Sequence, residues 1–293
     1  MDVKDLEIFQ TVAKHKSVSK AAAQLNYVQS NVTNRIHKLE SELETLLFHR
    51  NNRGVVITSA GEILLAYTDK ILNLFKEAKE AVKDREMPSG PLSIGATDIT
   101  TAVRLPSVLS SYHERYPDVH LSLKTGSTDE LVNEVLNYNL DGAFITDCID
   151  HPKIVQEPLI EEELVFIMGP STPKIEKLKD LQKRTILVFR TGCTYRAKLE
   201  QWLREEGIFP VKKIEFGTIE GMLGCVKAGL GAALVSRRIS KQLKDEGGIV
   251  CYPVPEKFKH VTTVFIRRRD VPVPNALEKF LDTTRKCFGE SEY

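Results

Sequence analysis

Several features that would assign a function quickly are missing from this 293-residue chain. Its formal net charge is only +1 at pH 7, so overall basicity does not indicate a nucleic-acid partner. No apolar run approaches the roughly 18 residues of a membrane span. The charged N-terminus lacks the apolar segment of a signal peptide. We therefore expect a cytoplasmic protein that does not bind a membrane.

Cysteine is scarce, and its spacing excludes the common cysteine sites. Neither the paired spacing of a zinc site nor that of a thioredoxin-like centre occurs. We expect reduced, mostly buried thiols at Cys148, Cys193, Cys225, Cys251 and Cys287. Cys193 could differ from the others, because it lies in a loop-like run between Gly192 and Thr194 where a redox sensor could sit.

The signatures of the common enzyme classes are also missing. The chain has no Gly-X-Ser-X-Gly elbow, zincin histidine pair, phosphate-binding loop or dinucleotide fingerprint, and its seven histidines are scattered. Four glycines cluster between residues 221 and 231, but their spacing fits no nucleotide motif. We expect a protein that is not an enzyme and that uses no cofactor or metal.

The first sixty residues, in contrast, carry a clear pattern. Apolar residues recur at helical spacing between residues 18 and 25, and residues 26–27 interrupt them. A second helical pattern follows at Val28, Val32, Ile36, Leu39 and Leu43. Two short helices around a tight turn are typical of a helix-turn-helix, in which the second helix reads DNA.

The second helix is predicted to have a polar, largely uncharged face opposite its apolar one. Amides and hydroxyls both donate and accept hydrogen bonds, which reading base edges in the major groove requires. We expect Gln29, Ser30, Thr33 and Asn34 to face bases or nearby phosphates, the alternative being a solvated helix face. Residues 1–58 hold eight Lys and Arg against six Asp and Glu. That excess is small for a monomer, so dimerisation would be needed to add phosphate contacts.

A wing is predicted after the two helices. Residues 48–54 form a basic, turn-forming stretch, and residues 55–57 read as a short strand. We expect Arg50 to contact a phosphate and Arg53 to reach the minor groove. Both arginines argue against the alternative of a small-molecule-binding protein whose head no longer binds DNA.

The whole segment resembles the LysR-type transcriptional regulators. The residues that carry the resemblance follow one another in unbroken order: Leu6, Phe9, Val12, Ser17, Ala21 to Ala23, Leu25, Gln29, Val32, Ile36, Leu39, Glu40, Leu46, Phe48, Arg50, Thr58, Ala60 and Gly61. The chain departs from the family pattern at Val28, where Ser is common, and at Ser30 and Asn31, where Pro and Ala are common. Valine is a poor N-cap, so the start of the second helix is the least defined boundary.

Residues 59–87 are predicted to form a linker helix. Ser59 and Glu62 have capping-box spacing, and residues 88–91 contain the prolines and glycine that end the helix. A heptad seam runs along it through Leu64, Tyr67, Ile71, Leu74, Ala78 and Ala81. The seam indicates a dimer, and the alternative is a helix that packs only on its own domain. The family resemblance implies that this helix pairs two subunits.

From residue 88 the chain alternates between predicted strands and helices. The strands are 92–96, 119–124, 143–145, 164–168, 186–189, 232–235 and 261–266; the helices are 103–116, 130–138, 195–206, 222–228 and 275–288. This α/β order predicts mainly parallel sheets with helices on both faces. It resembles the two-subdomain, periplasmic-binding-protein-like α/β effector domain of the same family, with subdomain I at about 88–160 and 266–293 and subdomain II at about 161–265. Few residues carry this second resemblance: Gly95, Leu105, Pro106, Tyr116, Pro117, Asp141, Gly229 and Gly231.

Ligands of open parallel sheets bind beyond the carboxyl ends of the strands. Those ends are rich in hydroxyl groups here, and we expect an effector site made by Thr97, Asp98, Thr100, Thr125, Thr128 and Thr146 from one subdomain and Thr191, Cys193, Thr194 and Thr218 from the other. Singly, such residues are more often helix caps, as the capping-box spacing of Ser127 and Glu130 illustrates. Together with helix N-termini they suit a small anion or carboxylate. Asp98 does not fit a simple anion site, and would instead cap its helix or bind an amine.

The sequence thus predicts a sequence-specific DNA-binding transcriptional regulator, a homodimer or homotetramer whose geometry a small polar effector controls. Its partners are double-stranded operator DNA, the effector and further copies of the chain. The resemblance implies a tetramer assembled through the linker helices and the effector domains. A regulator that senses oxidation at Cys193 in place of a ligand is the alternative.

Overall fold

A computed structural model describes residues 1–51, 54–81, 87–172, 178–208, 212–245 and 248–289. The chain divides into an N-terminal unit, residues 1–84 with 137–139, and a C-terminal unit made of the remaining residues. In the part of the chain that the structure describes, no helix is both long and apolar enough to cross a membrane.

The N-terminal unit begins with three helices, α1 (Val3–His15), α2 (Val18–Leu25) and α3 (Gln29–Glu42). Asp2 and Asp5 form a capping box at the start of α1, and the Ser17 hydroxyl accepts a hydrogen bond from the Lys20 amide at the start of α2. The turn between α2 and α3 bends at Asn26, whose backbone is left-handed with φ 56°. The predicted helix-turn-helix is confirmed.

A two-stranded wing packs on these helices. Strands β1 (Phe48–Asn51) and β2 (Gly54–Ile57) pair antiparallel, and the apolar side of α3 lies in one core with α1 and the wing. The buried carboxylate of Glu40 accepts hydrogen bonds from the backbone amides of Leu47 and Phe48, at 2.9 and 3.2 Å. It thereby fixes the segment that leads from α3 into β1.

Helix α4 (Ser59–Ala81) follows the wing within the same unit. Its hydroxyl cap is one residue earlier than the capping box predicted at Ser59: the Thr58 hydroxyl accepts from the Gly61 amide at 3.0 Å and donates to the Leu46 carbonyl. Thr58 takes this position because its own amide is held by the Leu47 carbonyl. The helix therefore starts where expected, with a different cap.

One side of α4 packs on its own unit and another side is open. Leu64 and Leu65 lie partly buried against the core of the unit, and Asp69 accepts a hydrogen bond from Gln10 of α1. Large apolar side chains remain exposed along the rest of the helix: Ile63, Tyr67, Ile71, Leu74 and Phe75. Three of the six residues of the predicted heptad seam, Tyr67, Ile71 and Leu74, belong to this exposed set, whereas Leu64 packs on the core of its own unit.

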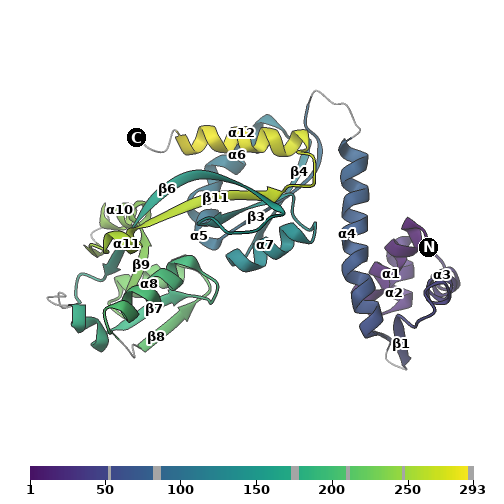
Figure 1. The fold of residues 1–293 in the computed structure, drawn as a ribbon, viewed down its shortest axis with the longest axis horizontal. Coiled ribbons are helices and arrows are strands. Elements are labelled where there is room, and N and C mark those ends of the chain that lie inside the picture. Colours follow the sequence, from purple (N-terminus) through teal and green to yellow (C-terminus); the bar gives the residue numbers. More distant parts are fainter. Residues whose placement is uncertain (52–53, 82–86, 173–177, 209–211, 246–247, 290–293) are drawn as a thin grey trace. The chain divides into compact units, whose positions relative to one another are not determined.

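The C-terminal unit contains two lobes joined by a mixed sheet (Figure 1). The first lobe is built from strands β3 (Gly90–Ala96), β4 (Val119–Thr125) and β5 (Gly142–Thr146) and helices α5 (Asp98–Val103), α6 (Leu105–Arg115), α7 (Thr128–Leu136) and α12 (Asn275–Gly289). Strand β3 pairs parallel with both β4 and β5. Helices α6 and α12 pack together through Tyr112 and Phe280, whose rings are 5.2 Å apart.

The second lobe repeats the strand-helix alternation. It contains strands β7 (Thr185–Phe189), β8 (Lys212–Phe216), β9 (Ala232–Ser236) and β10 (Val250–Tyr252), helices α8 (Thr194–Glu205), α9 (Ile219–Lys227), α10 (Arg237–Asp245) and α11 (Glu256–Lys259), and the 3₁₀ helix η1 (Leu178–Lys183). Strand β7 pairs parallel with β8 and β9. Helix α9 is followed by Gly229 in a left-handed conformation, as expected for a C-terminal glycine.

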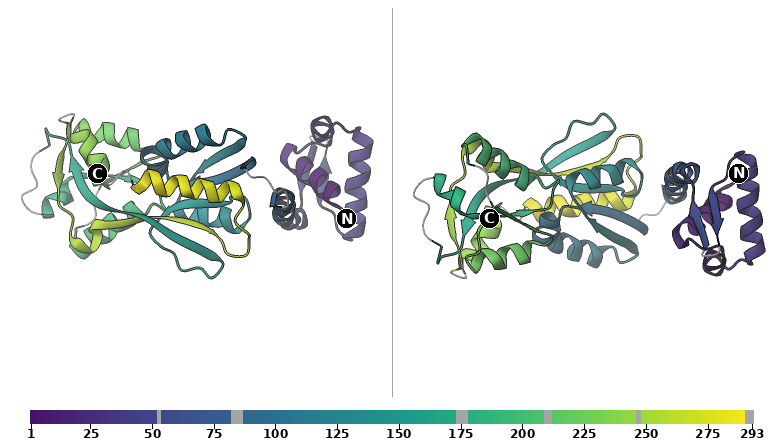
Figure 2. Two further views of the ribbon diagram at one scale, coloured as in Figure 1. Left: turned by 90° about the horizontal axis from the view of Figure 1, so that it is seen from above. Right: turned by 90° about the horizontal axis from the view of Figure 1, so that it is seen from below.

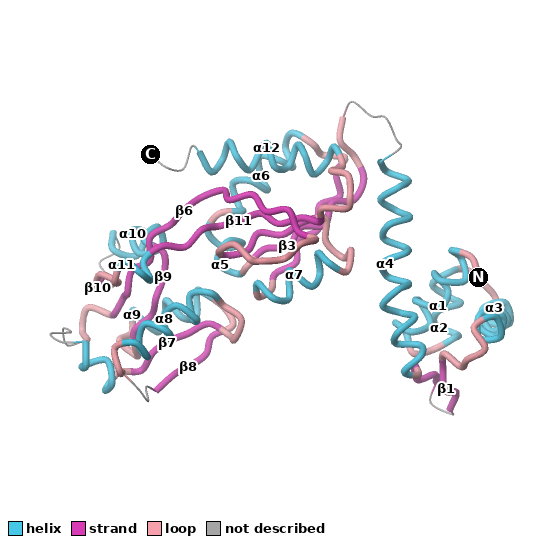
Figure 3. The backbone as a smooth tube through the Cα atoms, viewed as in Figure 1, coloured by secondary structure: helices cyan, strands magenta, loops and turns pink. Residues whose placement is uncertain are grey.

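Two long strands run from one lobe to the other, β6 (Ile154–Met168) and β11 (His260–Arg268) (Figures 2 and 3). They pair antiparallel with each other over residues 154–163 and 260–268, with a register shift between Thr263 and Val264. Strand β11 also pairs antiparallel with β5, and β6 with β9. The sheet is therefore mixed, and the prediction of mainly parallel sheets was wrong because these crossing strands supply antiparallel pairs at its centre.

Two predicted elements of this unit also need correction. The helix expected at 103–116 is α6, which begins at Leu105, and the short helix α5 before it, which meets α6 at Arg104, was not predicted. The strand expected at 164–168 is only the end of β6, because the charged residues before it belong to the same strand. Paired charges allow that segment to remain extended; Glu163, for example, lies 2.6 Å from Arg237 and 2.8 Å from Lys259.

Candidate functional site

The outward side of α3 is polar, as the sequence predicts. Gln29, Ser30 and Asn34 are exposed and Thr33 is half-buried, while Val32 and Ile36 are buried on the opposite side. Val28 caps the helix through its backbone alone, without a side-chain hydrogen bond. Within the described residues, the first-turn amides of α3 therefore have no side-chain acceptor at the N-terminus of the helix, where a phosphate oxygen is a favourable partner.

Two contacts determine which polar groups the outward side of α3 presents. The Ser19 hydroxyl of α2 donates to Oε1 of Gln29 at 3.1 Å, which leaves the NH₂ group of that amide to donate elsewhere. Arg35, in contrast, is held by the N-terminal unit, because its Nη1 lies 2.6 Å from the buried carboxylate of Asp5. The surface therefore presents mainly neutral donors and acceptors, which suit bases better than phosphates.

The wing arginines can be placed only in part. Arg50 lies in β1, paired opposite Val55, and the position of its side chain is not described. Arg53 lies outside the described residues. Their predicted contacts with phosphate and with the minor groove stay predictions.

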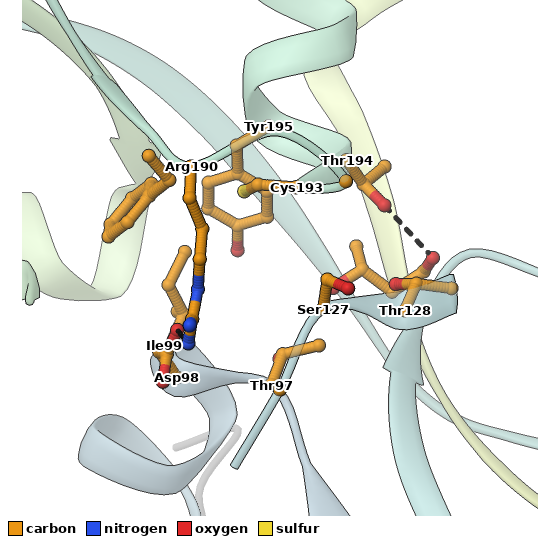
Figure 4. Close-up of a pocket in the computed structure, with 13 residues that line it drawn as sticks. Thr97, Asp98, Ile99, Ser127, Thr128, Arg190, Cys193, Thr194 and Tyr195 are labelled. Atoms are coloured by element: carbon orange, nitrogen blue, oxygen red, sulfur yellow. Dashed lines mark hydrogen bonds and ion pairs between the residues drawn. The ribbon is translucent and has the colours of Figure 1, made fainter. Parts of the chain in front are cut away.

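A pocket lies between the two lobes of the C-terminal unit (Figure 4). The space within it, including the part open to solvent, is about 380 Å³. The first lobe contributes the N-terminal ends of α5 and α7, and the second lobe contributes the end of β7 and the start of α8. Its lining is Thr97, Asp98, Ile99, Gly126, Ser127, Thr128, Thr146, Phe189, Arg190, Gly192, Cys193, Thr194 and Tyr195.

The pocket includes six of the ten residues predicted for the effector site: Thr97, Asp98, Thr128, Thr146, Cys193 and Thr194. The other four are not part of its lining. Thr100 is buried behind it, with its hydroxyl 2.9 Å from that of Thr97, and Thr218 caps α9 through the Gly221 amide. Thr125 and Thr191 are exposed at the ends of their segments.

Sequence reasoning missed Arg190, which changes the electrostatics of the pocket. Its Nη2 donates to Oδ2 of Asp98 at 2.7 Å, across the space between the lobes (Figure 4). Asp98 is the first residue of α5 and does not cap it, because the N-cap is Thr97. Arg190 directly follows a buried strand, just as Thr97 and Asp98 do, and this position was the signal that could have identified it.

Other contacts also join the two sides of the pocket. The Thr194 hydroxyl donates to the Thr146 carbonyl at 3.3 Å, and Lys198 of α8 lies 3.0 Å from Asp147 beyond β5. Gly192 has a left-handed backbone, and a Cβ atom there would come within 2.9 Å of Ser127. A glycine therefore permits the close approach of the two lobes.

Ser127 has both of the roles that the sequence left open. It forms a capping box with Glu130: the Ser127 amide donates to Oε2 of Glu130 at 2.8 Å, and the Glu130 amide donates to the Ser127 hydroxyl at 3.3 Å. The amide of Ser127 also lowers the pKa of Glu130 by stabilising its charged form. The cap nevertheless lines the pocket, so the alternatives of cap and site residue are compatible here.

Cys193 is the N-cap of α8, although its side chain makes no capping hydrogen bond. Burial is the main cause that raises the pKa of its thiol above the ordinary value. A raised pKa keeps the thiol protonated at neutral pH and lowers its reactivity with oxidants. The environment of the Cys193 thiol therefore suits a residue that lines a pocket better than one that senses oxidants.

Two family models match the sequence over most of its length. The model described as "Bacterial regulatory helix-turn-helix protein, lysR family" matches residues 3–62, and the model described as "LysR substrate binding domain" matches residues 85–288. The chain belongs to the LysR family. This LysR-family regulator has a DNA-binding head and an effector-binding α/β domain, as the sequence predicts.

Curated relatives resemble it over the full length. It is 46% identical over 288 residues to the HTH-type transcriptional regulator GltR of Bacillus subtilis (strain 168), covering 98% of this chain and 97% of that protein. It is 49% identical over 287 residues to the HTH-type transcriptional regulator SoxR of Arthrobacter sp. (strain TE1826), covering 98% of each. The protein is a DNA-binding transcriptional regulator that an effector controls, and its partners are operator DNA, the effector and further copies of itself.

Solved structures share the fold at lower sequence identity. Full-length CbnR in complex with its target DNA aligns with a TM-score of 0.71 at 23% identity, covering 98% of this chain and all of that one. A full-length OxyR variant from Pseudomonas aeruginosa aligns with a TM-score of 0.73 at 22% identity, covering 98% and 95%. The predicted combination of a winged helix-turn-helix, a linker helix and a two-lobed α/β domain is confirmed.

Proposed function

We propose that α3 of this LysR-family regulator reads base edges through Gln29, Ser30, Thr33 and Asn34, while Arg50 and Arg53 of the wing contact the backbone and the minor groove. The exposed polar side of α3, with the Gln29 amide oriented by Ser19, is the observation that carries this assignment. The DNA-binding part would then be residues 1–58 and the linker 59–87. Action on DNA also supports a cytoplasmic location and a role without catalysis.

We expect Gln29→Ala to weaken binding to the operator by about 1–3 kcal/mol and to relax preference at one base position, because a donor to a base edge is lost. Arg50→Ala should weaken binding to all sequences to a similar degree, because phosphates are present at every site. Gel-shift titrations on cognate and randomised duplexes measure both effects. Equal losses on both duplexes for Gln29→Ala would remove the base-reading role.

We propose that the pocket between the lobes binds the effector and that the effector is a small carboxylate. The observation that carries this proposal is Arg190, a half-exposed cation whose one ion-pair partner among the described residues is Asp98, in a pocket that also receives the N-terminal ends of α7 and α8. Hydroxyl groups of Thr97, Thr128 and Thr194 line the same space. A carboxylate would take the place of Asp98 on Arg190 and accept hydrogen bonds from helix amides.

This proposal makes opposite predictions for the two members of the ion pair. Arg190→Gln should weaken effector binding about 10- to 100-fold, because a charge-assisted hydrogen bond is lost. Asp98→Asn should tighten it about two- to fivefold, because the internal competitor loses its charge and an exposed ion pair is worth well under 1 kcal/mol. A thermal-shift screen of small carboxylates and amino acids, followed by calorimetry of the strongest ligand, measures both changes.

The control for this experiment is Arg285→Gln, which removes an arginine that is bound by both oxygens of Glu157 on the same domain. It should leave the affinity unchanged. Weaker binding to Asp98→Asn would instead indicate that the effector carries an amine that Asp98 recognises. A Cys193→Ser protein should keep its response, and loss of the response in that variant would favour oxidation sensing.

A further inference from the structure

A buried arginine lies where the first lobe meets the crossing strands. Arg104 stands at the junction of α5 and α6, and its Nη2 donates to Oε1 of Glu162 on β6 at 2.6 Å. Both side chains are almost fully buried, with 7% and 8% of their surfaces exposed. The guanidinium carbon also lies over the Phe288 ring, 5.9 Å from its centre.

The hydrogen bonds of this arginine are incomplete. A guanidinium carries five N–H donors, and within the described part of the chain neither Nε nor Nη1 of Arg104 has a partner. The Phe288 ring attracts the charge but takes no N–H in the plane of the guanidinium. Buried donors without acceptors are unfavourable, and they are more so on a charged group.

A second cation lies near the same carboxylate. Ser236, the last residue of β9, pairs with Leu164 of β6, and α10 begins at the next residue, so Arg238 is placed beside the stretch of β6 that contains Glu162. Burial, and then the charge of Arg104, lower the pKa of Arg238. The Glu162 carboxylate is hydrogen-bonded to Arg104, and the charge of Arg238 has no ion-pair partner within the described part of the chain.

Two buried hydroxyl groups near these arginines in the sequence are also without partners in the described structure. They are Oγ1 of Thr101, three residues before Arg104, and Oγ of Ser236, two residues before Arg238. Ser236 is fully buried, and its cross-strand partner Leu164 lies on the same side of β6 as Glu162, two residues away. Each of the two arginines thus has a buried hydroxyl donor two or three residues before it in the sequence.

We propose that Arg104 and Arg238 form a second binding site, separate from the pocket between the lobes, for a small singly charged anion such as chloride or a short carboxylate. The anion would accept from Nε and Nη1 of Arg104 and balance the charge of Arg238. Neither arginine lines the effector pocket. Because Arg104 belongs to the first lobe and Arg238 to the second, an anion bound to both stabilises the arrangement in which the lobes are close.

The first test is a thermal-unfolding titration of the full-length protein at constant ionic strength, with sodium gluconate replaced stepwise by sodium chloride or by sodium acetate. Gluconate is too bulky for an interior site. The unfolding midpoint should rise and saturate, by about 3–6 °C at ten times the dissociation constant. A rise with both salts indicates a site for any small monovalent anion, and a rise with one alone identifies which of the two it holds.

The variants separate this site from general salt effects. Arg238→Gln should abolish the saturable rise, and Arg285→Gln, which removes an arginine already bound by Glu157, should retain it. An equal rise in both variants would overturn the proposal. If Arg238→Gln fails to fold, Arg238→Lys should weaken the rise without removing it, because the charge remains but the planar donors are lost.

Crystals of the unchanged protein grown in sodium bromide give an independent answer. An anomalous peak within hydrogen-bond distance of Nε or Nη1 of Arg104 is expected. If the peak is present but the saturable rise of the unfolding midpoint is the same with and without Arg238, the position holds an adventitious ion only, and the proposal is overturned. Water at this position in place of bromide would overturn it as well.

Discussion

An Ile71→Asp protein should form a smaller oligomer and should bind its operator about 10²- to 10⁴-fold more weakly than the unchanged protein. Ile71 lies in the exposed apolar stripe of α4, with 38% of its surface exposed, between Tyr67 and Leu74. We propose that this stripe pairs two subunits, and a carboxylate buried there without a partner would prevent pairing. The loss equals the gain that two linked heads obtain when they bind one DNA molecule together.

Light scattering and gel-shift titration measure these two effects. Ala66→Asp is the matched control, because it places the same charge on an exposed position of α4 away from the stripe. It should leave both the oligomer and the affinity unchanged. If Ile71→Asp protein keeps its oligomeric state and affinity, α4 is not the pairing helix and packs only on its own unit.

Glu40→Ala should destabilise the N-terminal unit by about 3 kcal/mol, because the amides of Leu47 and Phe48 would lose their buried acceptor. Native-state hydrogen exchange on the full-length protein measures this as a loss of about a hundredfold in the protection of the most stable amides of α3. Glu42→Ala is the control, since Glu42 is on the same helix but exposed. Equal protection in the two variants would show that the wing does not depend on Glu40.

The local sequence pattern was sufficient to predict the helices of the DNA-binding head. The periodic burial of Val32, Ile36 and Leu39 follows directly from their spacing, and Asn26 adopts the left-handed turn that its residue type favours. The cap of α4 was shifted by one residue because two adjacent hydroxyls, Thr58 and Ser59, both suit the position. Hydrogen bonds with Leu46 and Leu47, which are distant from α4 in the sequence but adjacent to Thr58 in space, decide between them.

The C-terminal unit was predicted less completely because its decisive contacts are distant in sequence. Glu161 to Glu163 make β6 look like a solvated segment, although α10 and α11 supply the cations that pair with Glu163. Arg190 belongs to no motif, and its role is visible only when Asp98, 92 residues away, lies opposite. Hydroxyl-rich strand ends led to residues that line the pocket, but the direction of Thr100 depends on how α5 turns after Thr97.

The two strands that join the lobes limit how this regulator can move. Strands β6 and β11 share a continuous ladder of backbone hydrogen bonds, interrupted only by the register shift between Thr263 and Val264. Sliding one strand along the other would break many of these bonds at once, whereas bending both together at the irregular point would break few. The angle between the lobes can therefore change, but the two strands cannot slide along each other. The binding of an effector would change the angle between the two lobes. Because each lobe is long, this change of angle would displace its far end, and the displacement would act on the rest of the oligomer.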